Sequence, residues 1–245
     1  MKLISINAEW GKHHETIFPF LEREKPDVLC LQEIFQDELP IYEKLTGMKS
    51  FFKPECLFPV SGDNSVKKLF GPAILTKYET QFGFKYIVGD ESTIPFFMLK
   101  DSLKDRNITN IVLIWGDVKK EDGSIYRIAT THFTWTPEGE TTDYQMEDTT
   151  NLIRFLEEDL GGFILVGDLN APRGKEAFSM IAEKFKDNIP EEYDSSLDDE
   201  IHRLKGSKSL MVDGLFSTKE YLLSNVKLMS GVSDHRAVVA NIAKI

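Results

Sequence analysis

Polar side chains meet apolar runs at six places along this chain, and the clearest case is Phe163–Arg173 (FILVGDLNAPR). Four consecutive apolar residues are typical of a strand buried on both faces, and the turn-prone pair Gly167-Asp168 ends it. Pro172 cannot donate a hydrogen bond to a sheet, so Asp168 and Asn170 are left at a rim of the fold rather than in its core. A carboxylate and a carboxamide at a rim can take part in chemistry. The alternative is that they make only the hydrogen bonds of a turn.

The other five places repeat this pattern. Asn7, Glu33 and His132 each follow an apolar run, Asp213 interrupts one, and Asp234 and His235 precede the last one. A carboxylate after a buried strand, as expected for Glu33, must be paired or functional because an unpaired buried charge is costly. A salt bridge is the structural alternative for Glu33, and a structural role is the commoner one for a lone histidine such as His132.

If one rim gathers these residues, the site holds four carboxylates, two carboxamides and two imidazoles. This inventory suits one or two Mg²⁺ or Mn²⁺ ions, which prefer oxygen ligands and keep waters that a phosphate can displace. It suits zinc less well, because the sequence has no His/Cys cluster with zinc spacing.

The elements expected to position these residues are strands interspersed with helices. Strands are predicted to end at Asn7, at Gln32-Glu33 and at His132, and helical spacing predicts helices over 16–25, 144–160 and 176–185. Further strands are predicted over 71–78, 82–89, 95–99, 107–118, 163–170, 209–217 and 237–242, with a loop-rich segment over 49–77, a turn at 100–105 and a long acidic loop over 187–206. This order indicates packed layers rather than a helical bundle. No repeat, linker or composition shift divides the chain, so a single domain over residues 1–245 is expected.

The charge balance limits the kind of partner. The formal net charge is -11 and the pI is about 5.0, which argues against holding long nucleic acid by a broad basic surface but leaves room for a local basic cleft. Lys67, Lys68, Arg173 and Lys175 could line such a cleft, with solvated surface residues as the alternative. His202 and Arg203 could contact an anionic substrate, although a solvated turn is the favoured interpretation.

The remaining composition indicates a cytoplasmic protein. The apolar run at the amino terminus is too short for a signal peptide, and no stretch approaches the length of a membrane span. Cys30 and Cys56 do not make a disulfide framework, so reduced thiols are expected.

The ordered motifs SINAEW, LQEI, THFTW, GDLNAP, MVDGLF and GVSDHRAV resemble the endonuclease/exonuclease/phosphatase superfamily of metal-dependent phosphohydrolases across essentially the whole chain. The resemblance implies an α+β fold, a four-layer α/β/β/α sandwich of two packed mixed β-sheets flanked by helices, with the active site at one edge. It also implies Mg²⁺ or Mn²⁺ as the cofactor. Glu33 would be the principal metal ligand with Asn7 beside it, and Asp234 would bind the metal or one of its ligands. Glu9 departs from the Asp that abasic-site endonucleases carry there, and could add a ligand.

The same resemblance implies the catalytic roles. Asp168 would orient or deprotonate the attacking water, and Asn170 would hold that water or a phosphate oxygen. Asp213 would hydrogen-bond His235 and fix its tautomer. His132 and His235 would bind phosphoryl oxygens and assist proton transfer, and the choice of Asp168 or His235 as the base stays open.

The predicted function is therefore a divalent-metal-dependent phosphoesterase that hydrolyses phosphodiester or phosphomonoester bonds, acting as a monomer. Nucleic acid, either DNA or RNA, or a nucleotide is the favoured substrate. The alternatives are a small phosphorylated metabolite or lipid headgroup, and a catalytically silent binding module.

Overall fold

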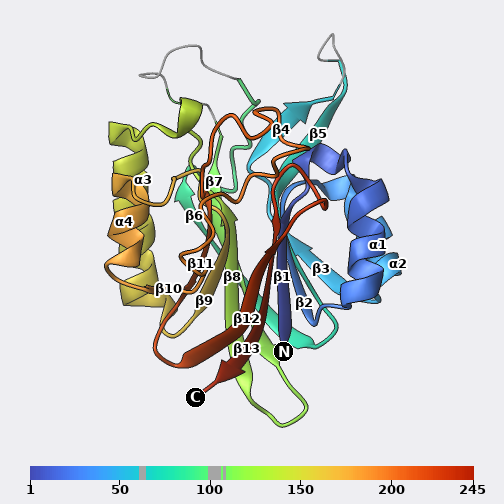
Figure 1. The fold of residues 1–245 in the computed structure, drawn as a ribbon. Helices are drawn as coiled ribbons and strands as arrows, with labels where there is room; N and C mark the ends of the chain where they lie inside the picture. The colour runs from blue at the N-terminus through green and yellow to red at the C-terminus, as the bar shows by residue number, and fades with distance from the viewer. Residues whose placement is uncertain (61–64, 99–105, 107–108) are drawn as a thin grey trace.

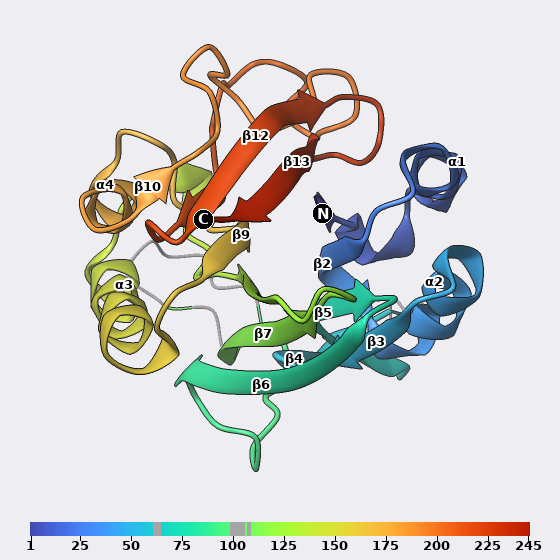
Figure 2. The same cartoon turned by 90° about the horizontal axis from the view of Figure 1, so that it is seen from below.

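The computed structural model describes residues 1–60, 65–98, 106 and 109–245, in which two β-sheets pack face to face between two pairs of helices (Figure 1). Seen from below, α1 (His14–Glu24) and α2 (Leu39–Thr46) lie outside one sheet, and α3 (Asp143–Phe155) and α4 (Glu176–Ala182) lie outside the other (Figure 2). The predicted four-layer α/β/β/α sandwich is therefore confirmed.

Both sheets are mixed. The first contains β1 (Lys2–Asn7), β2 (Val28–Phe35), β3 (Lys49–Phe52), β4 (Cys56–Pro59), β5 (Lys67–Thr76), β12 (Tyr221–Met229) and β13 (Ala237–Lys244), in the order β12-β13-β1-β2-β5-β3 with β4 also paired to β5. The second contains β6 (Glu79–Val88), β7 (Ile111–Lys119), β8 (Ile125–His132), β9 (Ile164–Asp168), β10 (Lys186–Asp187) and β11 (Asp213–Ser217), in the order β10-β11-β9-β8-β7-β6. Within them, β1 pairs with β2, and β8 with β9, in parallel.

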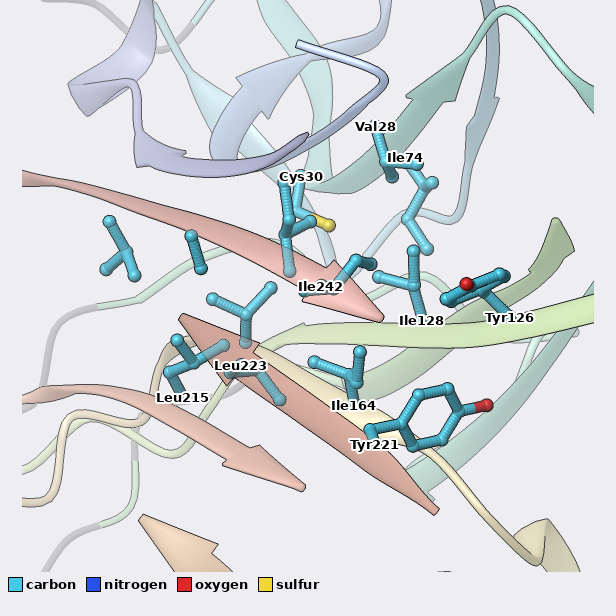
Figure 3. Packing of buried hydrophobic residues seen from close by; sticks show 14 of the residues in the cluster. Val28, Cys30, Ile74, Tyr126, Ile128, Ile164, Leu215, Tyr221, Leu223 and Ile242 are labelled. Carbon is cyan, nitrogen blue, oxygen red and sulfur yellow. The ribbon is translucent and has the colours of Figure 1, made fainter. Parts of the chain in front are cut away.

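The core has three apolar layers, because the residues of each central strand alternate between its two faces. Figure 3 shows the layer between the sheets, where Val28, Cys30 and Ile74 of the first sheet face Ile128 and Ile164 of the second. The opposite faces of the strands pack against the helices. For example, Ile4 and Leu29 join the buried face of α1 and α2. Both cysteines are free, as expected, and both are buried.

The structure differs from the sequence prediction between residues 49 and 77, at β12, which was not predicted, and at β11, which starts four residues later than predicted. The segment predicted to be loop-rich forms β3, β4 and a β5 that begins at Lys67, four residues before the predicted start of the strand at Gly71. Pairing with distant strands stabilises these short segments, a contribution that local pattern does not reveal.

Several predicted boundaries were also wrong. Strand β2 continues through Glu33 to Phe35, α1 starts two residues earlier than predicted, α4 ends at Ala182, and α3 passes into a π-turn at Leu156–Leu160. The described residues 95–98 form no strand, only a bridge between Leu57 and Phe96. The turn predicted over 100–105, position 99 and positions 107–108 lie outside the described residues.

Candidate active site

The sheet geometry brings the polar strand ends together at one end of the sandwich, opposite the two chain termini (Figure 1). Along β1, Leu3 and Ser5 face the second sheet, and the same alternation turns Asn7 to that side at the end of the strand. Along β9, Ile164 and Val166 lie between the sheets, so the next residue of that row is Asp168.

A buried polar layer lies one step below this rim. Gln32 Nε2 donates to Thr130 Oγ1 at 2.8 Å and to Ser5 Oγ at 3.0 Å, which joins the two sheets. Thr130 and His132 lie on the same face of β8, so His132 is the rim residue of its row.

Strand pairing then aligns the rim residues of the second sheet. His132 is the register partner of Asp168, and Asp168 is the register partner of Asp213. The absence of a side chain at Gly167 allows this close approach, because a Cβ there would lie 2.4 Å from the carbonyl oxygen of Thr131.

Glu33 reaches the site through a β-bulge. Simple alternation would turn its side chain towards the helices, as it does for Leu31. The pairing of β2 with β5 shifts register between Leu31 and Ile34, and Glu33 itself has a left-handed φ of 53°. As a result Ile34 packs with the helices, while the Glu33 carboxylate meets Asn7 and His132 at the rim.

Asp168 lies at the centre of these residues and is 1% exposed. Its Oδ2 accepts a hydrogen bond from Asn7 Nδ2 at 3.0 Å and lies 3.9 Å from His235 Nε2 and 4.0 Å from His132 Nε2. Asn7 Nδ2 also lies 3.2 Å from Glu33 Oε1. The turn interpretation accounts only for the other oxygen, since Asp168 Oδ1 accepts from the backbone N–H of Asn170 at 2.8 Å.

Each of the two imidazoles is paired with a buried carboxylate. His235 Nδ1 lies 2.8 Å from Asp213 Oδ2, so the contact predicted for this pair is present. His132 Nδ1 lies 3.3 Å from Oε2 of Glu55, a buried residue that sequence reasoning missed. Glu55 directly precedes the apolar run of β4, and this repeat of the strand-end pattern was the available signal.

Burial and charge shift the pKa values of these pairs in opposing ways. Burial alone would lower the pKa of His132, but its hydrogen bond to Glu55 and the charge of Glu33 raise it to about 9. Burial raises the pKa of Glu55 to about 7, against the effect of His132. The pKa of His235 is likewise raised well above its usual range, because Asp213 and Asp168 outweigh burial. Both imidazoles are therefore positioned to act as charged donors.

A cleft of about 470 Å³ is lined by Glu33, Glu55, His132, Asp168 and His235, whereas Asn7 and Asp213 support these residues from behind it. Backbone strain gathers at the cleft. Five lining residues other than glycine have left-handed φ values, namely Glu9, Trp10, Glu33, Glu138 and Asn170. Such conformations are costly and cluster at functional sites.

The long loop after β10 contributes to the cleft, contrary to the favoured sequence interpretation. His202 is buried, its ring centroid lies 6.0 Å from that of His235, and Arg203 also lines the cleft. The loop is held by backbone hydrogen bonds from Asp198 N–H to Asp234 and from Arg236 N–H to Ser196. Sequence offered no signal for these contacts beyond the presence of a histidine and an arginine in a long loop.

The other cations proposed for a cleft lie outside it. The guanidinium of Arg173 binds the Asp187 carboxylate at 2.7 Å and donates to the carbonyl of Ile189 at 2.9 Å, so it holds a loop and does not contact the cleft. Lys68 pairs with Asp37, Lys175 pairs with Glu140, and Lys67 lies over the Phe96 ring.

The donor set fits a divalent ion. Glu33, His132 and Asp168 each offer an atom within 4.8 Å of the others, as do Asp168, Asp213 and His235. Two further sets comprise Glu9, His13 and Asp234, and His202, Asp234 and His235. Carboxylates dominate at the centre, as Mg²⁺ and Mn²⁺ require. Glu9 already pairs with His13 and Lys12.

Comparison with known proteins identifies a family for this chain. Residues 5–224 match the model of the Endonuclease/Exonuclease/phosphatase family. A search of curated proteins finds no match. In the described part of the chain, no helix combines the length and hydropathy needed to cross a membrane.

Three solved structures illustrate the likeness in fold. The endonuclease/exonuclease/phosphatase from Bacteroides vulgatus is 14% identical with a TM-score of 0.72, covering 100% of this chain and 98% of that chain. The mannosyl-6-phosphatase of Bacteroides thetaiotaomicron is 13% identical with a TM-score of 0.71, covering 99% of each chain. D. rerio TDP2 complexed with single strand DNA product is 15% identical with a TM-score of 0.65, covering 100% of this chain and 99% of that chain. At these identities the likeness establishes the fold alone.

Because the family model spans residues 5–224, the chain belongs to the Endonuclease/Exonuclease/phosphatase family, whose members are metal-dependent phosphoester hydrolases.

Proposed function

We propose that this protein is a Mg²⁺- or Mn²⁺-dependent hydrolase of phosphodiester or phosphomonoester bonds, with a nucleic acid or nucleotide as its substrate. The observation that supports this function best is the convergence of Asp168 with two carboxylate-paired imidazoles, His132 and His235, whose Nε2 atoms lie 4.0 and 3.9 Å from Asp168 Oδ2. A site built only for structure would not need two such pairs around one buried carboxylate.

Glu33 would hold the ion together with Asp168, and Asp234 would hold it or one of its ligands. Asn7 Oδ1 accepts from the backbone N–H of Glu9, so Asn7 would support the ion through the two carboxylates. The bound ion would neutralise negative charge on the phosphoryl group and polarise it. Asn7 Nδ2 already donates to both Glu33 and Asp168, so the amide would orient the two carboxylates.

The chain's own groups would carry the proton and bind the oxygens. Asp168 would orient the attacking water and accept its proton, because its Oδ2 points into the space between the two imidazoles. His235, fixed by Asp213, and His132, fixed by Glu55, would donate to phosphoryl oxygens on which charge grows.

Asn170 would help to position the same water or a phosphoryl oxygen. Its Nδ2 donates to the carbonyl of Phe133 at 2.9 Å, and Gln145 Nε2 donates to the Asn170 carbonyl at 3.0 Å, so both its side chain and its backbone are held. This support preorganises a residue whose own φ of 50° is strained.

A cation near the mouth of the cleft would receive a further phosphate oxygen. Arg203 is exposed, lines the cleft and forms no salt bridge among the described residues. Its charge acts on the Glu138 carboxylate, which is already paired with Lys208. Arg106 also lines the cleft, but its guanidinium pairs with Asp148 at 2.6 Å. We therefore assign Arg203 rather than Arg173 to substrate binding.

The second candidate is the same chemistry on a small phosphorylated metabolite. The mannosyl-6-phosphatase of Bacteroides thetaiotaomicron has this fold, as does D. rerio TDP2, which was solved with single strand DNA product. The fold therefore permits both substrate classes, and the choice depends on the walls of the cleft.

Hydrolysis of a substrate panel tests the proposal. The panel contains single-stranded DNA, RNA, abasic-site duplex, mononucleotides, sugar phosphates and inositol phosphates, each with Mg²⁺, Mn²⁺ or chelator. We expect metal-dependent cleavage of nucleic acid or nucleotide that is lost in His235→Ala and kept in the control His14→Ala, since His14 lies between α1 and α2 away from the cleft. Cleavage confined to sugar phosphates would move the protein to the second candidate. No cleavage, or equal cleavage by His235→Ala, would refute the assigned site.

A further inference from the structure

Four aromatic side chains form one side of the cleft, and we refer to Trp10, Phe58, Phe70 and Phe97 as the aromatic wall. Phe58 lies at its centre, with ring centroids 5.0 Å from Trp10, 5.2 Å from Phe70 and 4.8 Å from Phe97. Such spacings are those of interacting aromatic rings. Three of these residues, all but Trp10, also belong to a small apolar cluster separate from the main core layers.

The wall is only partly covered by the rest of the protein. Trp10 is 37% exposed, and Phe58 and Phe97 are half-buried, whereas Phe70 is buried. A purely structural cluster of this size would be expected to shield its largest rings. The exposed rings instead face a cleft that also contains the catalytic groups.

The backbone of Trp10 carries a cost that packing does not explain. Its φ is 60° and that of the preceding Glu9 is 40°, although a bulky residue rarely adopts the left-handed region. The strained turn presents the indole at the mouth of the cleft. Lys12 Nζ lies 4.2 Å from the ring centroid of Trp10, so a cation stands beside the same ring. Strain that exposes a tryptophan beside a reaction centre points to a ligand.

The wall is continuous with the proposed catalytic residues. The ring of Phe70 lies 5.9 Å from that of His132 in an edge-on arrangement, and Phe70 is on β5, the strand that pairs with the bulged β2 carrying Glu33. A group packed on the wall would therefore be attached within a few bonds of a phosphate held at His132.

We propose that the aromatic wall binds the nucleobase of the substrate whose phosphoester is held at His132 and His235. This inference rests on the proposed function and narrows it, because a sugar phosphate has no aromatic ring to stack there. Bases pack on aromatic side chains through their π-faces with little dependence on sequence, which suits a wall of flat rings with few polar groups. An aliphatic chain would gain less from ordered rings with a cation beside them.

Binding of two matched probes tests the wall independently of catalysis. Adenosine 5′-monophosphate and ribose 5-phosphate share the sugar and the phosphate and differ only in the base. Calorimetric titration of the whole chain with each probe, in chelator to prevent turnover, gives the two Kd values. We expect the nucleotide to bind about 5- to 150-fold more tightly, the range for packing one base on aromatic side chains.

Variants then assign the difference to the wall. Trp10→Ala and Phe97→Ala should each bring the ratio of the two Kd values towards one, and Trp10→Phe should keep most of it. Trp115→Phe is the matched control, because Trp115 packs against Phe155 on the helix side of the second sheet and lies outside the cleft. Circular dichroism shows whether each variant is folded. If one of the two alanine variants does not fold, the other still tests the aromatic wall.

Each outcome is informative. The proposal that the aromatic wall binds a nucleobase would be refuted by any of three results. These are equal Kd values for the two probes in the wild type, no measurable binding of either probe, and a ratio of Kd values that is unchanged in both alanine variants. Octyl phosphate binding more tightly than the nucleotide would also overturn it, by indicating an aliphatic chain as the occupant. Base-dependent binding without any metal-dependent hydrolysis would instead refute the proposed function and leave the wall standing.

Discussion

Replacing Asp213 by Asn is expected to reduce turnover sharply while leaving the shape of the site unchanged. Asp213 Oδ2 lies 2.8 Å from His235 Nδ1, and the two residues are 3% and 7% exposed, so water cannot replace the lost charge. A charge-assisted hydrogen bond of this kind contributes about 1.5–3 kcal/mol. If that free energy is used to hold the imidazole as a donor in the transition state, kcat falls by about 10- to 150-fold.

Steady-state kinetics at saturating Mg²⁺ on the best substrate of the panel measures this loss. We expect KM to change little, because His235 would act on charge that develops during the reaction rather than on the bound substrate. The matched control is Asp117→Asn, which removes a carboxylate from the ion pair with Arg127, at 2.7 Å, outside the cleft. If folded Asp213→Asn kept kcat within twofold of the wild type, the pairing of Asp213 with His235 would have no catalytic role.

Three further perturbations test other parts of the account. Glu33→Gly should raise the free energy of unfolding by about 1–2 kcal/mol, because φ is 53° at this bulge and glycine removes the strain. The same variant should abolish turnover, because it removes the carboxylate proposed to hold the ion. Glu33→Ala keeps a Cβ and should lose turnover without that gain, so an alanine variant as stable as the glycine variant would contradict the bulge argument. Arg173→Lys should lower the free energy of unfolding by about 1–3 kcal/mol by weakening the hydrogen bonds to Asp187 and Ile189, and should leave KM unchanged. A tenfold rise in KM would instead indicate that Arg173 binds the substrate. Burial raises the pKa of the Cys30 and Cys56 thiols, so neither should react with a thiol reagent at pH 8 until urea unfolds the chain. Modification of either cysteine in the native protein would refute their burial.

The rim residues could be predicted because each ends or begins a strand. Alternation along β1 and β9 determines which face Asn7 and Asp168 occupy, and parallel neighbours end at the same edge. The contact of Asp213 with His235 was predicted from the family resemblance, and strand pairing brings Asp213 beside Asp168.

The remaining parts of the site depend on contacts between distant segments. The bulge at Glu33 results from pairing with β5 about 40 residues later, and Glu55 is positioned only when β4 joins the same strand. His202 reaches the cleft because its loop pairs with the segment before β13 through a bridge between Leu197 and His235. Local sequence patterns carry no information on such pairings.

Arg173 illustrates the opposite error. An arginine directly after the GDLNAP motif suggested a phosphate ligand, but its guanidinium donates to the carbonyls of a neighbouring loop and pairs with Asp187. The position of Arg173 near the site could be predicted from the sequence. The direction of its side chain could not, because it depends on the conformation of the neighbouring loop.

A metal site at this rim is tested most directly by the Mn²⁺ concentration needed to restore hydrolysis after chelator treatment and removal of the chelator. The same titration is run on Glu33→Gln and on Glu158→Gln, which changes an exposed glutamate in the π-turn that follows α3. We expect saturable recovery in the wild type and in Glu158→Gln, and we expect Glu33→Gln to require at least tenfold more Mn²⁺. Hydrolysis that persists in chelator, or identical Mn²⁺ dependence in all three proteins, would contradict a metal site at this rim.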